Sequence, residues 1–150
     1  DGRETGAVLK CGGRIPDFSI TMSYGSMVTG AGLRLSVSVI VFFHTSCPDC
    51  RKTLPVLQKI YDEYASRGVR FALISRAEAQ DSVSSFWQEQ GLTMPFSAQN
   101  DRKVYEMFAA SLVPRVYICR YGIIEYIFTD DPVPSYDDLN LALVKSEKKQ

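Results

Sequence analysis

The hydrophobic and polar positions of this chain change period several times, and each change marks an expected element. Residues 37–43 are apolar except for one serine, which is typical of a strand that is covered on both faces. Residues 51–67 follow with apolar side chains at the spacing of one helix face, and residues 69–74 form a second apolar strand. A helical pattern then spans residues 80–90. This alternation of strand and helix predicts an α/β fold.

Two hairpins and a short helix complete the pattern. Residues 18–22 and 27–29 alternate in polarity around a turn and predict a β-hairpin near the N-terminus. Residues 116–119 and 123–128 flank a second turn and predict another. Between the hairpins, Asn100 is expected to cap a short helix.

The two ends of the chain differ in character. Residues 1–14 are polar and rich in glycine, so we expect a flexible N-terminal arm. Residues 15–150 then form one domain, because a chain of 150 residues is long enough for a single core. A last helix is expected to begin near Tyr136. Its apolar side is expected to consist of Leu139, Leu141, Leu143 and Val144.

The composition is that of a globular domain, with 45% hydrophobic and 23% charged residues. The formal net charge of zero gives no support for nucleic acid or an anionic membrane surface as a partner. No apolar run approaches the roughly 18 residues that span a bilayer, so we expect no membrane span in this chain. The first residues lack the regions of a signal peptide. We therefore expect either a cytoplasmic protein or a mature form whose leader was removed.

Two of the four cysteines, Cys47 and Cys50, form a Cys-x-x-Cys pair directly after the apolar strand. In a strand–turn–helix this spacing places Cys47 at the helix N-terminus, where its sulfur faces free backbone N–H groups and is favoured as the reactive thiolate. Cys50, one turn further in, can close a reversible disulfide with it. Pro48 suits the first helical position because its missing N–H has no partner there. We expect Cys119 to be a small buried residue and Cys11 to be a free thiol.

With this motif and the order of elements around it, the chain resembles the thioredoxin fold and, more narrowly, the TlpA/ResA branch of bacterial thiol–disulfide oxidoreductases. The resemblance runs from about residue 14 to residue 128. A Cys-x-x-Cys pair alone is a moderate signal, and the full order of elements makes it a strong one. The matching positions are residues 16–18, Phe42 and Phe43, Cys47 and Cys50, Pro55, Val113 and Pro114, and Gly122.

The resemblance implies a thioredoxin-like three-layer α/β/α sandwich with a central mixed sheet and an N-terminal β-hairpin extension. It also implies thiol–disulfide exchange, in which Cys47 attacks a partner disulfide and Cys50 resolves the mixed disulfide. The partners would be protein thiols or disulfides and an upstream redox donor. The only redox group would be the Cys47–Cys50 disulfide, without a cofactor or a metal. The location would be extracytoplasmic, in the bacterial periplasm or envelope.

Val113 and Pro114 match the family's cis-proline, which implies that Val113 lies beside the Cys47 sulfur and that its backbone pairs with an extended partner segment. Asp49, in the first helical turn, suits the helix dipole but opposes a nearby thiolate, whereas Arg115 would favour that thiolate. We therefore expect Arg115 to offset Asp49. The alternative is that Arg115 is a solvated cation at a strand edge.

Four positions depart from the family's pattern. Ser46 stands where a tryptophan usually precedes the first cysteine, and Pro48 follows that cysteine instead of preceding the second. Val41 replaces the buried aspartate of thioredoxins, and Thr53 replaces a glutamate that many TlpA-like sequences carry. The proton acceptor that the aspartate provides is therefore missing from its usual position.

Two other functions fit a thioredoxin-like chain with these cysteines. A peroxidase of the peroxiredoxin type needs threonine and proline at positions before its nucleophile where this chain has His44 and Ile40. A non-enzymatic interaction or metal-carrier module would keep the cysteines for binding. Two thiolates leave a tetrahedral zinc shell incomplete, and His44 is the only histidine. We expect His44 to be a hydrogen-bonded loop residue or, alternatively, a donor to the thiolate.

Overall fold

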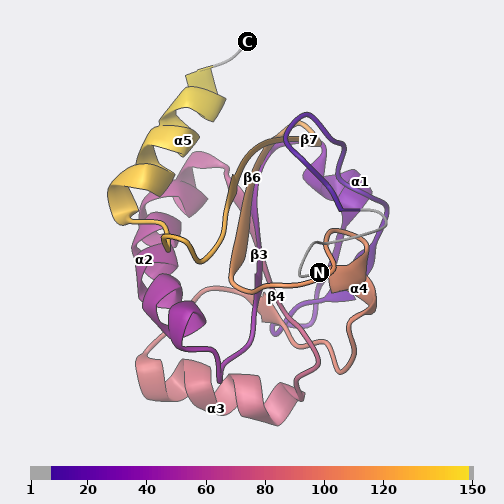
Figure 1. Ribbon diagram of the computed structural model, residues 1–150, viewed down its shortest axis with the longest axis vertical. Helices are drawn as coiled ribbons and strands as arrows, with labels where there is room; N and C mark the ends of the chain where they lie inside the picture. Colours follow the sequence, from indigo (N-terminus) through magenta and orange to yellow (C-terminus); the bar gives the residue numbers. More distant parts are fainter. Residues whose placement is uncertain (1–7, 149–150) are drawn as a thin grey trace.

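The computed structural model describes residues 8–148, which form a central sheet between two covering layers (Figure 1). The sheet is five-stranded, in the order β5-β4-β3-β6-β7. β3 pairs in parallel with β4 and antiparallel with β6, so the sheet is mixed, as the resemblance implied. The strands are β3 (Val37–Phe43), β4 (Arg70–Ser75), β5 (Phe96–Ser97), β6 (Arg115–Arg120) and β7 (Ile123–Phe128).

One face of the sheet is covered by the three longer helices. These are α2 (Pro48–Tyr64), which a 3-10 turn η1 (Ala65–Arg67) extends, α3 (Gln80–Gln90) and α5 (Tyr136–Lys148). In Figure 1, α2 and α5 lie along one side of the sheet and α3 crosses its lower end. Their buried side chains form one core with every second residue of β3, because alternate side chains of a strand point to the same face.

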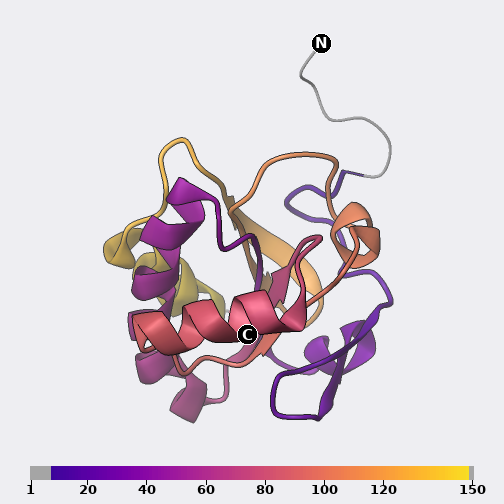
Figure 2. The same ribbon diagram turned by 90° about the horizontal axis from the view of Figure 1, so that it is seen from below.

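The opposite face is covered by shorter elements, which Figure 2 shows on the far side of the sheet from α2. They are the hairpin of β1 (Ser19–Thr21) and β2 (Met27–Thr29), and the helices α1 (Gly30–Leu33) and α4 (Lys103–Glu106). These elements form a second core with Ile40 and Phe42 of β3. The central strand is therefore apolar on both faces because both are covered. The expected three-layer sandwich and N-terminal hairpin are confirmed.

Two details of the helices differ from expectation. α4 begins at Lys103, whose backbone N–H donates to Asp101 Oδ1 at 2.9 Å, so the prediction of an Asn100 cap is wrong. α5 begins at Tyr136 as predicted, but Leu141 is 54% exposed. The 3.6-residue period explains this exposure, because Leu141 lies off the stripe that faces the sheet. The helix buries Leu139, Ala142, Leu143 and Ser146.

Part of the expected N-terminal arm is held against the edge of the sheet. The Gly12 backbone N–H donates to the Ile124 carbonyl oxygen at 2.8 Å, and Arg14 forms an antiparallel bridge with Ile123 of β7. This part of the segment is therefore anchored instead of loose, because its backbone groups find partners on β7. Residues 1–7 of the expected arm lie outside the described residues.

Candidate active site

The Cys47 sulfur lies at the first turn of α2. The loop of residues 44–47 joins β3 to α2, and Cys47 is the capping residue of the helix. The Cys50 backbone N–H donates to Cys47 Sγ at 3.3 Å, which satisfies one of the N–H groups that a helix start leaves unpaired. Pro48 occupies the first turn, where its missing N–H costs nothing. The strand–turn–helix geometry expected for the Cys-x-x-Cys pair is thus confirmed.

Cys50 lies one turn deeper and is fully buried, whereas Cys47 is half-buried. Both side chains are free thiols. Burial raises the pKa of the Cys50 thiol, and the hydrogen-bonded Cys47 acts in the same direction. The backbone at His44 and the charge of Arg76 oppose this rise in the pKa of Cys50. The pair therefore combines an accessible outer sulfur with an inner thiol that stays protonated at neutral pH.

The loop before β6 comes against the outer sulfur. The Cys47 thiol donates to the Val113 carbonyl oxygen, with 3.6 Å between sulfur and oxygen, although the two residues are 66 apart in the chain. The Val113–Pro114 peptide bond is cis, as the resemblance implied. Val113 is half-buried and Pro114 is buried. The structure thus brings these two predicted site residues to the same end of the inner strands as the cysteines, because Cys47 follows β3 and Pro114 directly precedes β6.

Arg115 is buried instead of solvated. It is 5% exposed, and its Nε donates to the Ser111 carbonyl oxygen at 3.0 Å while its Nη1 donates to Tyr117 Oη at 3.4 Å. Its partner across the sheet is Phe42 of β3, so the side chain lies on the face that the short elements cover. The alternative interpretation as a solvated strand-edge cation is therefore wrong. Asp49 lies in the first turn of α2, which covers the other face.

Sequence reasoning missed a buried carboxylate beside the active-site loop. Glu78 follows β4 and is 7% exposed. Its Oε1 accepts from the Thr45 backbone N–H at 3.0 Å, and its Oε2 accepts from the Thr45 hydroxyl. Arg76 lies at the same edge, and its backbone N–H donates to the Phe43 carbonyl oxygen at 3.0 Å. The parallel pairing of β3 and β4 would have indicated both Arg76 and Glu78, since the residues that follow two parallel neighbouring strands meet at the same end of the sheet.

His44 is a hydrogen-bonded loop residue, as expected. Its Nδ1 accepts from the Ser46 backbone N–H at 3.1 Å and lies 2.8 Å from Ser46 Oγ. The same nitrogen is 4.0 Å from Glu78 Oε1. The ring is thus hydrogen-bonded within its own loop and lies near the buried carboxylate. Across residues 8–148, the His, Cys, Asp and Glu side chains form no cluster of three or more that could hold a metal ion.

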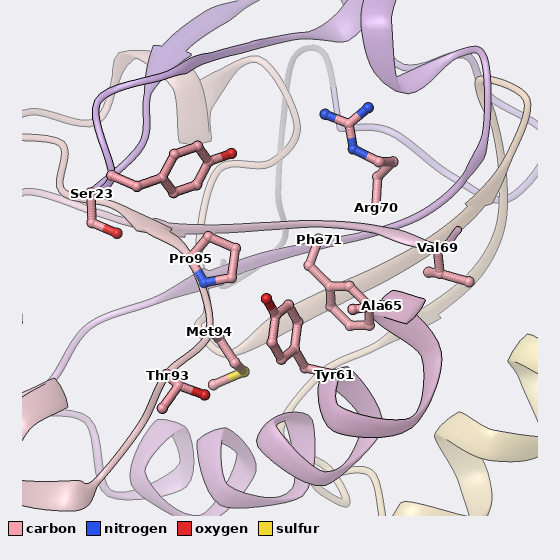
Figure 3. Close-up of a pocket in the computed structure, with 10 residues that line it drawn as sticks. Ser23, Tyr61, Ala65, Val69, Arg70, Phe71, Thr93, Met94 and Pro95 are labelled. Carbon is pink, nitrogen blue, oxygen red and sulfur yellow. The ribbon is translucent and has the colours of Figure 1, made fainter. Parts of the chain in front are cut away.

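The cavity shown in Figure 3 lies away from the cysteines. It has a volume of about 390 Å³, and its lining includes Tyr61 and Ala65 near the C-terminal end of α2 and Arg70 at the start of β4. Cys47 caps the other end of α2, whose 17 residues span about 25 Å. In Figure 3 the Arg70 guanidinium points away from Tyr61 and Met94. This cavity therefore belongs to the opposite end of the molecule from the Cys-x-x-Cys pair.

Sequence comparison identifies proteins that are similar to this chain over most of its length. Residues 10–141 match the family described as Redoxin. The thiol-disulfide oxidoreductase ResA of Bacillus subtilis is 23% identical over 107 residues, which are 71% of this chain and 60% of ResA. ResA of Halalkalibacterium halodurans is 25% identical over 107 residues, which are 71% of this chain and 61% of that protein. The chain spans about three fifths of the length of these relatives.

Solved structures share the fold. A Bacteroides thetaiotaomicron protein with a solution structure has a TM-score of 0.84 and 23% identity, covering 93% of this chain and 90% of its own. A thiol:disulfide interchange protein of the thioredoxin family from Chlorobium tepidum has a TM-score of 0.77 and 22% identity, covering 97% and 98%. Because the Redoxin match spans residues 10–141 and the sheet and helices are those of thioredoxin-like proteins, the chain belongs to the Redoxin family.

Proposed function

We propose that this chain is a thiol–disulfide oxidoreductase that exchanges the Cys47–Cys50 pair with thiols and disulfides of partner proteins. The observation that carries the proposal is the position of the two sulfurs. Cys47 Sγ accepts a first-turn N–H of α2 at 3.3 Å and is accessible, while Cys50 is buried directly behind it. Helix N–H groups and the helix dipole favour an anion at the outer sulfur, which is the form that attacks a disulfide.

In the reducing direction, the Cys47 thiolate attacks one sulfur of a partner disulfide. A Cys47–partner bond forms, the partner's S–S bond breaks, and the released sulfur takes a proton from water. Cys50 then loses its proton and attacks Cys47 Sγ, which forms the Cys47–Cys50 disulfide and frees the second partner thiol. Two electrons pass from the cysteine pair to the partner, and an upstream dithiol donor returns them. The same steps in reverse oxidise a partner.

The Val113 backbone supplies the docking edge for the partner. Its carbonyl oxygen lies 3.6 Å from Cys47 Sγ, so an extended segment that pairs with this backbone would bring its sulfur to the outer cysteine. Pro48 and Asp49 follow Cys47 in the first turn of α2, and Pro114 follows Val113 through the cis peptide bond. The reaction uses no cofactor beyond the cysteine pair.

The proposed location is extracytoplasmic, in the bacterial envelope, as the likeness to TlpA/ResA proteins implies. Each helix between residues 8 and 148 is too short or too polar to cross a membrane. Cell fractionation of the full-length protein tests the location. Recovery in the cytoplasm alone would contradict it.

Reduction of insulin by dithiothreitol tests the activity. The chain is expected to accelerate precipitation of the insulin B chain, and Cys47→Ser is expected to lower the rate to that of dithiothreitol alone. Cys11→Ser, which changes an exposed cysteine, is the matched control and is expected to behave as the wild type.

Two results would contradict the proposed activity. One is a wild-type chain in which oxidised glutathione fails to join Cys47 to Cys50. The other is consumption of hydrogen peroxide through Cys47 without any reduction of insulin, which would favour the peroxidase instead.

A further inference from the structure

The loop that carries Cys47 is held by a charged side chain from another part of the chain. Glu78 accepts both the backbone N–H and the hydroxyl of Thr45, which lies two residues before Cys47. The two residues are 33 apart in sequence. Because one residue supplies both donors, the carboxylate fixes the orientation of the Thr45 peptide as well as its position.

Thr45 is also held from the other side. Arg51 Nε donates to the Thr45 carbonyl oxygen at 2.7 Å, and the Arg51 guanidinium lies over the Phe86 ring at 5.3 Å. The N–H, hydroxyl and carbonyl groups of Thr45 are therefore all bound by charged side chains from two elements. Thr45 is buried and so are its two bonds to Glu78, which are therefore shielded from water, whereas Arg51 is exposed.

Glu78 is itself rigidly placed. Its backbone N–H donates to the Gln99 carbonyl oxygen at 2.8 Å. The backbone N–H of the preceding residue, Ala77, donates to the Asp101 backbone carbonyl oxygen at 3.0 Å. Ala77 has a φ of 54°, in the left-handed region that residues with a Cβ seldom adopt. This turn directs the carboxylate inward, where it is 7% exposed and also lies 4.0 Å from His44 Nδ1. A buried carboxylate is costly without partners, so the turn and the Thr45 bonds belong together.

The two redox forms depend on this anchor to different degrees. In the disulfide, the covalent bond to Cys50 would hold Cys47 in place. In the dithiol, Cys47 keeps its position through its loop and through the 3.3 Å contact of its sulfur with the Cys50 N–H. We propose that Glu78 is a positioning residue that, through Thr45, stabilises the dithiol form of the Cys47–Cys50 pair relative to the disulfide. This inference rests on the proposed function, since it requires that the two cysteines form a redox couple.

The inference is tested by equilibrating the full chain with reduced and oxidised glutathione and measuring the ratio of the Cys47–Cys50 disulfide to the dithiol. Glu78→Ala is expected to increase the disulfide-to-dithiol ratio about ten-fold at a given glutathione ratio, because both hydrogen bonds from Thr45 to the carboxylate are lost. Thr45→Val, which keeps the shape and one of the two bonds, is expected to increase it about three-fold. Thr45→Ser restores the hydroxyl and is expected to return the ratio to that of the wild type.

Glu78→Gln separates positioning from charge, because a glutamine keeps an acceptor for the Thr45 N–H and a donor for its hydroxyl oxygen. It is expected to lie within about two-fold of the wild type, since both hydrogen bonds are kept. Asp137→Ala, which removes an exposed acidic side chain from the first turn of α5, is the matched control and is expected to leave the ratio unchanged. Urea unfolding of every variant checks that the fold is retained. If Glu78→Ala fails to fold, Thr45→Val and Thr45→Ser carry the test.

Several outcomes would overturn the inference. An unchanged ratio in both Glu78→Ala and Thr45→Val would show that the anchor does not discriminate between the redox forms. A shift in Glu78→Gln as large as that in Glu78→Ala would assign the effect to charge instead of position. A wild-type chain that forms no Cys47–Cys50 disulfide would refute the proposed function itself, which is a separate result.

Discussion

Cys50 and Cys119 are equally buried but lie in very different parts of the fold. Both side chains are fully buried, and burial raises the pKa of both thiols, that of Cys119 to about 12. Cys50 lies in the first turn of α2, just beyond the end of the central strand β3, and its backbone N–H contacts the half-buried Cys47 sulfur at 3.3 Å. Cys119 lies inside β6, between Ser38 of β3 and Ile124 of β7.

The difference teaches that burial by itself does not make a thiol redox-active. A buried thiol can exchange only if an accessible sulfur brings the reacting bond to it, and in this chain Cys47 is placed to do that for Cys50. For Cys119 the layer of side chains that covers its face of the sheet would have to move first. Cys11 is exposed and lies near enough to Cys119 to add to the rise in the pKa of its thiol, but the Cys119 side chain itself has no exposed surface. Four experiments sharpen or break this comparison.

The largest expected effect separates the two buried thiols by function. Cys50→Ala is expected to lower insulin reduction to the rate of dithiothreitol alone and to leave a stable mixed disulfide on Cys47, because nothing resolves it. Mass spectrometry after reaction with oxidised glutathione detects the trapped adduct. Cys119→Ala is the matched control, and a comparable loss of activity in that variant would break the comparison.

The second expected effect concerns the pH dependence of resolution. Because the pKa of Cys50 is raised by burial, its thiolate fraction is small at neutral pH and grows about ten-fold per pH unit below that pKa. Release of glutathione from a Cys47–glutathione adduct is therefore expected to accelerate about ten-fold per unit between pH 7 and 9, as followed by stopped-flow fluorescence.

Arg76→Gln tests the electrostatic part of this prediction. It removes a charge that lowers the pKa of Cys50, so resolution is expected to slow at every pH in that range. A rate independent of pH in the wild type would contradict a protonated inner thiol.

The third expected effect is alkaline destabilisation that depends on redox state. A thiol whose pKa is higher in the folded than in the unfolded chain stabilises the fold below its ordinary value of 9.0, and this stability is lost as pH rises towards the folded value, about 12 for Cys119. Each such thiol is expected to lower the free energy of unfolding by about 1.4 kcal/mol per pH unit in that window.

Urea unfolding at pH 8 and pH 10.5 measures this loss. Of the two buried thiols, both Cys50 and Cys119 are expected to cost the reduced chain stability, whereas in the oxidised chain Cys50 is in the disulfide and Cys119 alone of the two contributes. Oxidised Cys119→Ala is expected to lose neither contribution. Equal losses in the reduced and oxidised wild type would be inconsistent with a raised pKa at Cys50.

The smallest expected effect is on stability at neutral pH. Cys119→Ala removes one buried sulfur from the second core and is expected to lower the free energy of unfolding by about 1 kcal/mol, with redox behaviour unchanged. Cys119→Ser places a hydroxyl beside the buried Ser38 side chain, its cross-strand partner, and is expected to cost no more than Cys119→Ala because the two hydroxyls can form a hydrogen bond. Urea unfolding of the two variants at pH 7 makes the measurement, and a Cys119→Ser chain much less stable than Cys119→Ala would argue against that hydrogen bond.

Most of the fold followed from short-range patterns. The apolar run of β3 predicts its bounds and its burial on both faces, and the turn at Gly122 predicts the hairpin of β6 and β7. The short spacing between the end of β3 and the Cys-x-x-Cys pair predicts that Cys47 lies at the start of α2. The exposure of Leu141 was missed, because a list of apolar residues in a helix does not say which lie on the stripe that faces the sheet.

The sequence alone therefore determined the order of the elements and the position of the outer sulfur, because strand period, helix period and the free N–H groups of a helix start all act within a few residues. Only the tertiary structure decided which side chains surround that sulfur. Glu78 meets Thr45 because β3 and β4 run parallel in a particular register, and Arg115 lies on the face away from α2 for the same kind of reason. Register and packing set such contacts, and neither leaves a signature in the neighbouring residues.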